Sequence, residues 1–197
     1  MIPTLDKKYW NNLYLNNESG WDVGEISNPL KNYFLQLKNK TGKILIPGAG
    51  NSYEAEFLLQ NGFTNVFICD FAEEPLKNIA NRCKNLKSEN LLKCNFFDLK
   101  SNSYDLIIEQ TFFCALNPEL RKKYFEKMHA LLKPGGKLVG LLFNHHFEND
   151  SPPYGGTESE YKSYFVDLFK IKVFENCYNS IQPRLGRELF INLEKNS

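Results

Sequence analysis

The sequence predicts an α/β fold with a mainly parallel sheet that ends in an antiparallel hairpin. Along most of the chain, short apolar runs without helical period alternate with segments of helical period. A glycine-containing turn, residues 48–52, joins the first apolar run to the helical segment that follows it. The connection between the last two apolar runs is too short for a parallel crossover, so these two strands should pair antiparallel.

Length and composition predict one globular domain with a full core, because the chain has 197 residues, of which 42% are hydrophobic and 24% are charged. We expect a single domain over residues 1–197, made of an N-terminal lid segment, 1–40, and a core, 41–197. The net charge of +1 gives no electrostatic reason to expect a nucleic-acid or membrane partner.

The cysteines and the N-terminal residues indicate where in the cell the protein is expected to be. The five cysteines are scattered, and their odd number argues against a disulfide framework, while the absence of a Cys-x-x-Cys pair argues against zinc. The chain shows neither a signal-peptide core nor an apolar run of membrane-spanning length. These features predict a cytoplasmic protein, which we expect to be a monomer without a metal.

The first 40 residues are rich in aromatic side chains. Residues 6–15 predict a short helix that carries Trp10 and Tyr14, and the turn and loop after it contain Trp21. A second helix should begin at Pro29. Aromatic rings can cover an apolar ligand and attract a cation over their faces, which would suit a lid. The alternative is that the two tryptophans simply pack against the edge of the sheet.

Residues 43–70 are the stretch around which the chain is organised: a buried strand at 43–47, the glycine turn, a helix at 53–60 and a second buried strand at 66–70 that ends in Asp70. Gly48 and Gly50 allow a tight turn and the close approach of a ligand. A carboxylate at the end of the second strand can accept hydrogen bonds from the hydroxyls of a ribose.

The nature of the nucleotide follows from a missing glycine. Dinucleotide sites need a third glycine where this chain has Tyr53, so the stretch favours S-adenosylmethionine, which has no pyrophosphate, over NAD. A glycine turn in an ordinary α/β protein is the other interpretation, because two glycines alone are a weak signal.

The remaining elements continue the alternation. We expect helices at 73–86, 118–132 and 158–168, a helix stop at 133–136, and strands at 91–97, 104–109, 137–143, 169–178 and 187–193. Ligands of such sheets bind at the carboxyl ends of the strands. The loops that fall there are 48–52, 70–73, 95–98, 110–116 and 144–157.

Six stretches carry a family resemblance that covers nearly the whole chain. They are Trp10 with residues 21–24 (WDVG), 45–50 (LIPGAG), 104–115 (YDLIIEQTFFCA), 131–136 (LLKPGG), 152–154 (PPY) and 181–188 (IQPRLGRE). The TFFCA run and the later PPY are fairly specific, whereas KPGG is common to many methyltransferases. With these stretches the chain resembles the thiopurine methyltransferase-like superfamily, and most closely its halide/thiol methyltransferase branch.

The resemblance implies a Rossmann-like class I methyltransferase fold that uses S-adenosylmethionine. It implies a cofactor site made of the lid residues Trp10, Tyr14 and Trp21, of Gly48 and Gly50 along the methionine part, of Asp70 on the ribose, of Asn95 and Phe96 beside the adenine, and of Gln110 near the sulfonium. Two positions depart from the family pattern. Asn95 stands where the family often has Asp, and Glu109 with Gln110 replaces the usual Asp-Tyr.

The methyl acceptor should be a small molecule, and we expect Trp21, Phe113, His145, Tyr154 and Arg184 to contact it. Phe112 should line the same site. No residue is assigned as catalytic. His145 could take a proton from a thiol or organise a water, but a surface histidine without a role is the simpler interpretation. Cys114 is expected to be a buried packing residue.

We therefore predict an S-adenosylmethionine-dependent methyltransferase whose acceptor is a small soft nucleophile, namely a thiol, sulfide or halide. Residues 151–154 (SPPY) also resemble the motif of enzymes that methylate nitrogen, but there the motif follows the fourth strand directly, whereas here it follows the fifth. An N-methyltransferase, a non-catalytic cofactor-binding module and an NAD-dependent oxidoreductase are the alternatives.

Overall fold

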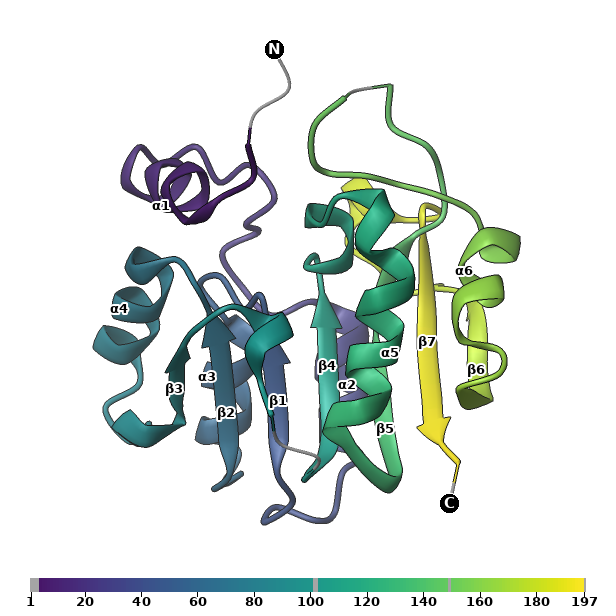
Figure 1. Ribbon diagram of the computed structural model, residues 1–197. Coiled ribbons are helices and arrows are strands. Elements are labelled where there is room, and N and C mark those ends of the chain that lie inside the picture. The colour runs from purple at the N-terminus through teal and green to yellow at the C-terminus, as the bar shows by residue number, and fades with distance from the viewer. Residues whose placement is uncertain (1–3, 101–102, 149, 197) are drawn as a thin grey trace. The chain divides into compact units, whose positions relative to one another are not determined.

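The computed structural model describes residues 4–100, 103–148 and 150–196. It has the predicted α/β class, with a seven-stranded sheet that is mostly parallel and ends in an antiparallel hairpin (Figure 1). The chain forms two compact units, residues 1–99 and residues 100–197. None of the helices in the described part of the chain has the length and apolarity needed to cross a bilayer.

The described residues of the first unit form three parallel strands in the order β3-β2-β1 and four α-helices. Its elements are α1 (Lys7–Leu15), α2 (Asn28–Leu35), β1 (Ile44–Pro47), α3 (Tyr53–Gln60), β2 (Val66–Asp70), α4 (Glu73–Arg82) and β3 (Leu91–Lys93). Every residue of β1 is buried, as expected for a strand covered on both faces. Asp6 begins α1, because its side chain accepts a hydrogen bond from the Tyr9 N–H at 2.8 Å.

Two elements of this unit are shorter than predicted. The helix expected at 73–86 ends at Arg82, because Cys83 leaves the helical region with φ −111° and ψ 82°. The strand expected at 91–97 ends at Lys93. There the Cys94 N–H bonds back to the Leu92 carbonyl at 3.0 Å. Asn95 then accepts from the Phe97 N–H at 2.9 Å and caps a 3₁₀ turn, so the local polar contact replaces the strand ladder.

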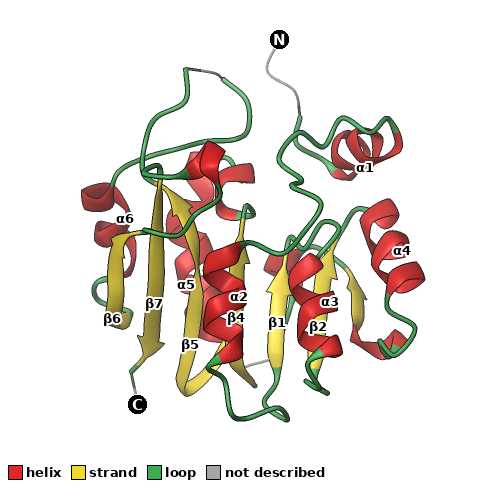
Figure 2. Ribbon diagram, turned by 180° about the vertical axis from the view of Figure 1, so that it is seen from behind, coloured by secondary structure: helices red, strands yellow, loops and turns green. Residues whose placement is uncertain are grey.

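The second unit has four strands in the order β4-β5-β7-β6. β4 and β5 are parallel, and β7 runs antiparallel to both β5 and β6, which confirms the predicted hairpin. Figures 1 and 2 place α5 and α6 on the same face of these strands. The elements are β4 (Tyr104–Gln110), α5 (Arg121–Leu131), β5 (Leu132–Phe143), α6 (Glu158–Phe165), β6 (Phe169–Asn176) and β7 (Glu188–Lys195).

The predicted helix stop at 133–136 lies inside a strand. The helix ends at Leu131, one residue before the predicted end, and a 3₁₀ turn at Pro118–Leu120 replaces its predicted first residues. β5, however, begins at Leu132 rather than at 137, because Leu132 already pairs with Tyr104 before the register shifts. Gly135, with φ +74°, lies between Leu132 and Lys137, where the register of the pairing shifts. The later helix and strands differ from prediction only at their ends.

Candidate active site

Asp70 lies at the carboxyl end of β2 in the first unit, and its side chain is only 8% exposed. One carboxylate oxygen accepts from the Gly50 N–H at 3.0 Å and the other from the Ala72 N–H at 2.8 Å. Burial raises the pKa of Asp70, and the N–H groups of Gly50, Ala72 and Phe71 oppose this by stabilising the charge. The carboxylate thus ties the glycine turn to the end of the strand.

The glycine turn uses left-handed backbone at every second residue: Gly48, Gly50 and Ser52 have φ of 55°, 51° and 50°. A Cβ on Gly50 would lie 2.5 Å from the hydroxyl oxygen of Tyr14, so only glycine fits beneath that ring. Ser52 is 3% exposed, and its hydroxyl has no hydrogen-bond partner within the described chain. A buried hydroxyl without a partner at a glycine turn is a feature that a bound ligand would satisfy.

The three predicted aromatic lid residues form one cluster over this turn. Trp21 lies edge-on to Trp10, with ring centroids 5.6 Å apart, and edge-on to Tyr14 at 5.8 Å. Burial raises the pKa of the Tyr14 phenol, and the nearby Asp70 charge adds to the effect, while a hydrogen bond with Trp21 opposes it. The phenol therefore stays neutral beside the Asp70 carboxylate.

Two polar contacts join the N-terminal segment to the rest of the first unit, and neither of them is evident from the sequence. The Asn11 side-chain oxygen accepts from the N–H groups of Glu73 and Glu74, both at 3.0 Å, and so caps α4 from α1. α4 has no capping side chain of its own at Ala72. Figure 1 shows α1 lying against the upper end of α4.

The second contact joins the loop after α1 to the glycine turn. Asp22 accepts a short hydrogen bond from the side-chain amide of Asn51 and a longer one, 3.5 Å, from the Tyr53 hydroxyl. Asn51 in turn accepts from Asn78 on α4 at 2.9 Å. The loop, the turn and α4 therefore form one polar network.

We expect Asn11→Ala to loosen the N-terminal segment. The two N–H groups at the start of α4 lose their cap, which costs about 0.5–2 kcal/mol, and α1 loses its anchor. Hydrogen exchange of residues 4–28 should accelerate in the free protein and slow again when S-adenosylhomocysteine is added. Asn12→Ala, at an exposed position of the same helix, is the matched control. Equal exchange in both variants and in wild type would contradict the anchoring role.

The two residues predicted beside the adenine lie on the segment after β3. Asn95 is exposed and uses its side-chain oxygen to cap the following turn, whereas Phe96 is 4% exposed and lies edge-on to Phe97. Their contact with an adenine stays a prediction.

The residues of the first unit fit the adenosyl part of S-adenosylmethionine. An ionised carboxylate has about four lone-pair sites, so Asp70 keeps acceptor capacity for ribose hydroxyls beside its backbone bonds. The glycine turn leaves room for close approach, and the aromatic cluster offers faces that attract a sulfonium. The structure brings together Trp10, Tyr14, Trp21, Gly50 and Asp70, and their contact with the cofactor stays a prediction.

In the second unit, Glu109 shapes the turn that follows β4. Its side chain is fully buried. One carboxylate oxygen accepts from the N–H groups of Phe112 and Phe113 at 2.8 and 2.9 Å, and the other accepts a short hydrogen bond from the Tyr124 hydroxyl. Burial raises the pKa of Glu109 to about 7, although these three hydrogen bonds oppose the shift.

The turn shaped by Glu109 carries several of the predicted acceptor residues. Gln110 ends β4 and is half-buried, and Thr111 adopts φ +55°. Phe112 is half-buried, whereas Phe113 is 1% exposed and packs against Tyr124 at 5.0 Å. Phe113 therefore offers almost no free surface to an acceptor, and its substrate contact stays a prediction that its packing does not support.

The Pro-Pro-Tyr segment docks onto the same turn. The Tyr154 N–H donates to the Cys114 carbonyl at 2.7 Å. Cys114 is buried, its thiol contacts the Thr111 carbonyl at 3.3 Å, and burial raises its pKa. These contacts agree with a packing role. The segment follows β5, as the sequence predicts, so it is not in the position of the nitrogen-methylating motif.

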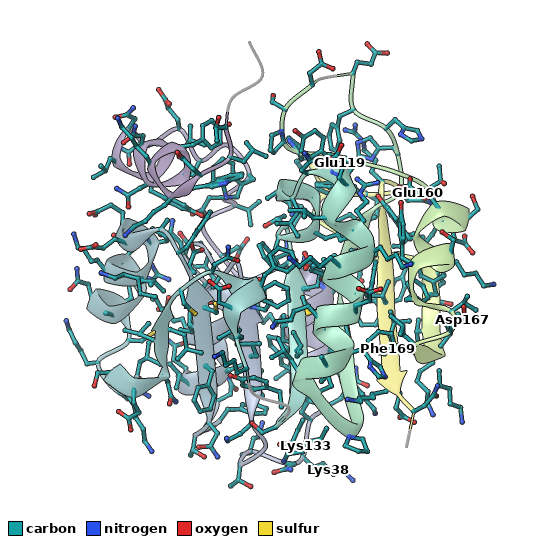
Figure 3. The ribbon with its side chains drawn as sticks, viewed as in Figure 1. Lys38, Glu119, Lys133, Glu160, Asp167 and Phe169 are labelled. Atoms are coloured by element: carbon teal, nitrogen blue, oxygen red, sulfur yellow. The ribbon has the colours of Figure 1, made fainter. Side chains whose placement is uncertain are left out.

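Arg121, at the start of α5, binds Gly155 and the first turn of α6, and this role was not identified from the sequence. It is 3% exposed, forms an ion pair with Glu160, and donates to the Gly155 carbonyl at 2.7 Å. Its guanidinium also lies over the Phe113 ring, 5.1 Å from the centroid. Figure 3 shows Glu160 on α6, with Lys133 at the opposite end of this unit.

His145 is engaged on both ring nitrogens by one residue. Its Nε2 lies 2.8 Å from a guanidinium nitrogen of Arg187, and its Nδ1 lies 3.4 Å from the Arg187 carbonyl. Because a guanidinium only donates, Nε2 must be the acceptor and Nδ1 carries the proton. Partial burial and the Arg187 charge lower the pKa of His145. The ring is neutral, but its basic nitrogen is occupied by Arg187.

Arg184 is buried in the second unit, at 9% exposure, next to another buried charge. Its guanidinium lies 3.5 Å from the Glu188 carboxylate and over the ring of Phe143, 5.6 Å from the centroid. Burial raises the pKa of Glu188, while Ser180 and Arg184 oppose the shift. Arg184 is therefore paired, and its contact with an acceptor stays a prediction.

Comparison with known proteins places these features in a family. The model of the family described as thiopurine S-methyltransferase matches residues 5–191. A probable thiol methyltransferase 2 from Arabidopsis thaliana is 28% identical over 193 residues, which cover 95% of this chain and 85% of that protein. Thiocyanate methyltransferase 1 from Brassica oleracea is also 28% identical, over 94% of this chain and 84% of its own length.

Solved structures agree with the fold. The 1,6-didemethyltoxoflavin-N1-methyltransferase of Burkholderia thailandensis, solved with S-adenosylhomocysteine, superimposes with a TM-score of 0.78 and 17% identity, over 98% of this chain and 88% of that one. A SAM-dependent methyltransferase from Methanosarcina mazei gives 0.67 with 18% identity, over 87% and 99%. At these identities the likeness concerns the fold alone.

Proposed function

Because the chain belongs to the thiopurine S-methyltransferase family, we propose that it is an enzyme that transfers the methyl group of S-adenosylmethionine to a small soft nucleophile, namely a thiol, sulfide or halide. The observation that carries the proposal is the Asp70 carboxylate bound to the Gly50 N–H, with Tyr14 and Trp21 over the same turn. The named relatives act, by their names, on a thiol and on thiocyanate.

The chemistry places few demands on acid–base groups. When bound, the cofactor would supply a methyl group on a positively charged sulfur. A nucleophile held about 3–3.5 Å from the methyl carbon, in line with the carbon–sulfur bond, would take that methyl as the sulfur leaves as the thioether of S-adenosylhomocysteine. A thiolate or halide brings no proton to the reaction, so no strong general base is required. This agrees with His145, whose acceptor nitrogen is occupied by Arg187, and we assign no catalytic base.

The residues of the chain would bind the cofactor and orient it toward the acceptor. Asp70 holds the ribose, Gly48 and Gly50 admit the methionine part, and Trp10, Tyr14 and Trp21 cover the sulfonium with aromatic faces. Asn95 and Phe96 flank the adenine. Gln110, Trp21, Phe113, His145, Tyr154 and Arg184 are the proposed residues around the reacting methyl and its acceptor.

We also propose that residues 1–197 act as one methyltransferase domain with 1–40 as its lid, and that the protein is a cytoplasmic monomer. The small net charge supports a small-molecule acceptor rather than nucleic acid or a membrane surface. Light scattering of the full chain would test the monomer, because a doubled mass would contradict it.

The deciding experiment measures transfer of a tritium-labelled methyl group from S-adenosylmethionine to hydrogen sulfide, thiophenol and iodide. We expect labelled methanethiol from hydrogen sulfide and labelled methyl phenyl sulfide from thiophenol as the main products. Calorimetry with S-adenosylhomocysteine measures cofactor binding in parallel. Cofactor binding without transfer to any of the three acceptors would favour a non-catalytic binding module, and absence of binding would refute the proposal altogether.

Gln110 should influence the choice of acceptor. In the halide/thiol branch that the sequence resembles, the corresponding residue is a tyrosine, whereas the amide of Gln110 is more polar and more flexible. We expect wild type to prefer thiols over halides in kcat/KM and Gln110→Tyr to shift the ratio toward iodide. If the thiol-to-iodide ratio of kcat/KM is unchanged in Gln110→Tyr, the residue does not set acceptor selectivity.

A further inference from the structure

Cys69 and Cys94 form a close thiol pair in the first unit. Their sulfur atoms lie 3.8 Å apart, and the Cys69 sulfur also lies 3.6 Å from the Cys94 carbonyl oxygen. Both cysteines are reduced in this structure. A disulfide needs a sulfur–sulfur distance of about 2.05 Å, so the two side chains have to approach by less than about 2 Å.

The two cysteines differ in accessibility and in freedom to move. Cys69 is fully buried within β2, where it pairs with Pro47 on one side and Leu92 on the other. Cys94 is half-exposed, while the other four cysteines are buried, and it lies just beyond the last residue of β3 in a tight turn. Cys94 is therefore the sulfur that an oxidant reaches, and it can move toward the fixed Cys69.

The positions of the two sulfurs connect them to the proposed cofactor site. Cys69 directly precedes Asp70, and Cys94 directly precedes Asn95, whose side chain caps the turn that carries Phe96. If Cys94 moves toward β2, Asn95 and Phe96 move with it, because they follow it in the chain. These are the residues proposed to flank the adenine.

We propose that Cys69 and Cys94 form a reversible disulfide in response to hydroperoxides, and that this disulfide weakens cofactor binding. The formation of the disulfide rests on the thiol geometry alone, whereas its effect on cofactor binding rests on the proposed function.

The disulfide would form in two steps. The Cys94 thiolate attacks one peroxide oxygen, the O–O bond breaks, and Cys94 becomes a sulfenic acid while the other oxygen leaves as hydroxide. The Cys69 sulfur then attacks the Cys94 sulfur, the S–O bond breaks, and the sulfenic hydroxyl leaves as water with the Cys69 proton. Burial raises the pKa of the Cys69 thiol, and Cys94 adds to the effect, so Cys69 keeps its proton until this second step.

The experiment treats the reduced full-length protein with hydrogen peroxide, unfolds it in denaturant and then alkylates the remaining thiols, because Cys83, Cys114 and Cys177 are buried in the folded protein. We expect three alkylated cysteines, one peptide pair joined through Cys69 and Cys94, and full reversal with dithiothreitol. Affinity for S-adenosylhomocysteine, measured by calorimetry, should fall about twofold to tenfold on oxidation, which corresponds to the displacement of one ordinary hydrogen bond.

Two variants serve as the test and its control. Cys94→Ser should form no cross-link, and peroxide should leave its affinity for S-adenosylhomocysteine unchanged. Cys177→Ser removes a different thiol, whose contact with Asn179 at 3.4 Å a serine hydroxyl can reproduce, and it should behave as wild type.

Other results would overturn the proposal. If Cys94 is oxidised to sulfinic acid while Cys69 stays alkylatable, the pair is not a disulfide site. If the cross-link forms and the affinity does not change, the coupling to cofactor binding is wrong. If the reduced wild type binds no S-adenosylhomocysteine, the proposed function fails together with the coupling, and peptide mapping still decides the disulfide.

Discussion

Asp70→Ala should lower the affinity for S-adenosylmethionine by about tenfold or more. Hydrogen bonds to a charged acceptor contribute about 1.5–3 kcal/mol, and the ribose hydroxyls would lose theirs. The structure adds a second effect. The N–H groups of Gly50 and Ala72 bond to this carboxylate at 3.0 and 2.8 Å, and each buried donor left unpaired costs roughly 1–3 kcal/mol. We therefore expect a lower melting temperature as well.

Calorimetry and thermal unfolding separate the two effects when Asp70→Asn is included. Its amide oxygen can still accept from one backbone N–H, so it should unfold closer to wild type while its cofactor affinity stays low. Asp105→Ala is the control, because it removes a half-exposed carboxylate paired with Lys133 at 2.9 Å, a contact that contributes about 0–1 kcal/mol. Wild-type affinity in Asp70→Ala would refute the ribose assignment.

Glu109→Ala should be strongly destabilising. It leaves the Phe112 and Phe113 N–H groups and the Tyr124 hydroxyl without their shared acceptor in a fully buried place, and roughly 1–3 kcal/mol is lost for each group that stays unpaired. Any protein that folds should show lower kcat, because the turn from Gln110 to Phe113 is no longer held. Denaturant unfolding at neutral pH and the methyl-transfer assay measure the two effects.

Glu109→Gln keeps the size of the side chain and removes its ionisable group. The folded-state pKa of Glu109 is raised from 4.5 to about 7, so its contribution to stability is fully present below about pH 4.5 and is lost as the pH rises to about 7. The free energy of unfolding of wild type should therefore fall relative to that of Glu109→Gln across this window, by on the order of 3 kcal/mol.

Glu119→Gln, at an exposed glutamate of the same unit (Figure 3), provides the control. Its free energy of unfolding is measured over the same pH window, as the reference for replacing an exposed Glu by Gln. A difference between wild type and Glu109→Gln that is constant from pH 4.5 to 7.5 would show that Glu109 does not titrate there.

The stretch from β1 to β2 was predictable from sequence almost to the residue, because buried apolar runs, two glycines and a terminal carboxylate are local signals. β3 was not, because the side chain of Asn95 ends the strand by bonding to the backbone of Phe97. The irregular start of β5 was missed for a similar reason: the motif 133–136 is typical of a helix stop, but only the partner strand determines that it also pairs.

Within the candidate site, the sequence predicted residues that could contact the cofactor, but it did not predict the residues that position them. Trp10, Tyr14, Trp21, Gly50 and Asp70 carry recognisable chemistry in local motifs. The role of Asn11, in contrast, depends on α4, more than sixty residues away along the chain. Glu109 was noted only as a departure from a family pattern. Its function as an acceptor for a turn and a tyrosine depends on the geometry of α5, which a sequence does not display.

Asn11 of α1 caps α4, and this contact determines how the N-terminal segment would move if the proposed lid opened. Isolated helices shorter than about 12–15 residues are marginal in water, and α1 has nine residues, whose side chains are at most partly buried. α1 therefore owes its helical form to its attachment. If Asn11 leaves α4, the segment loses the contact that favours its helical form, so release of the proposed lid would be local melting rather than a rigid-body movement. Cofactor entry and partial unfolding of the N-terminus would then be a single equilibrium.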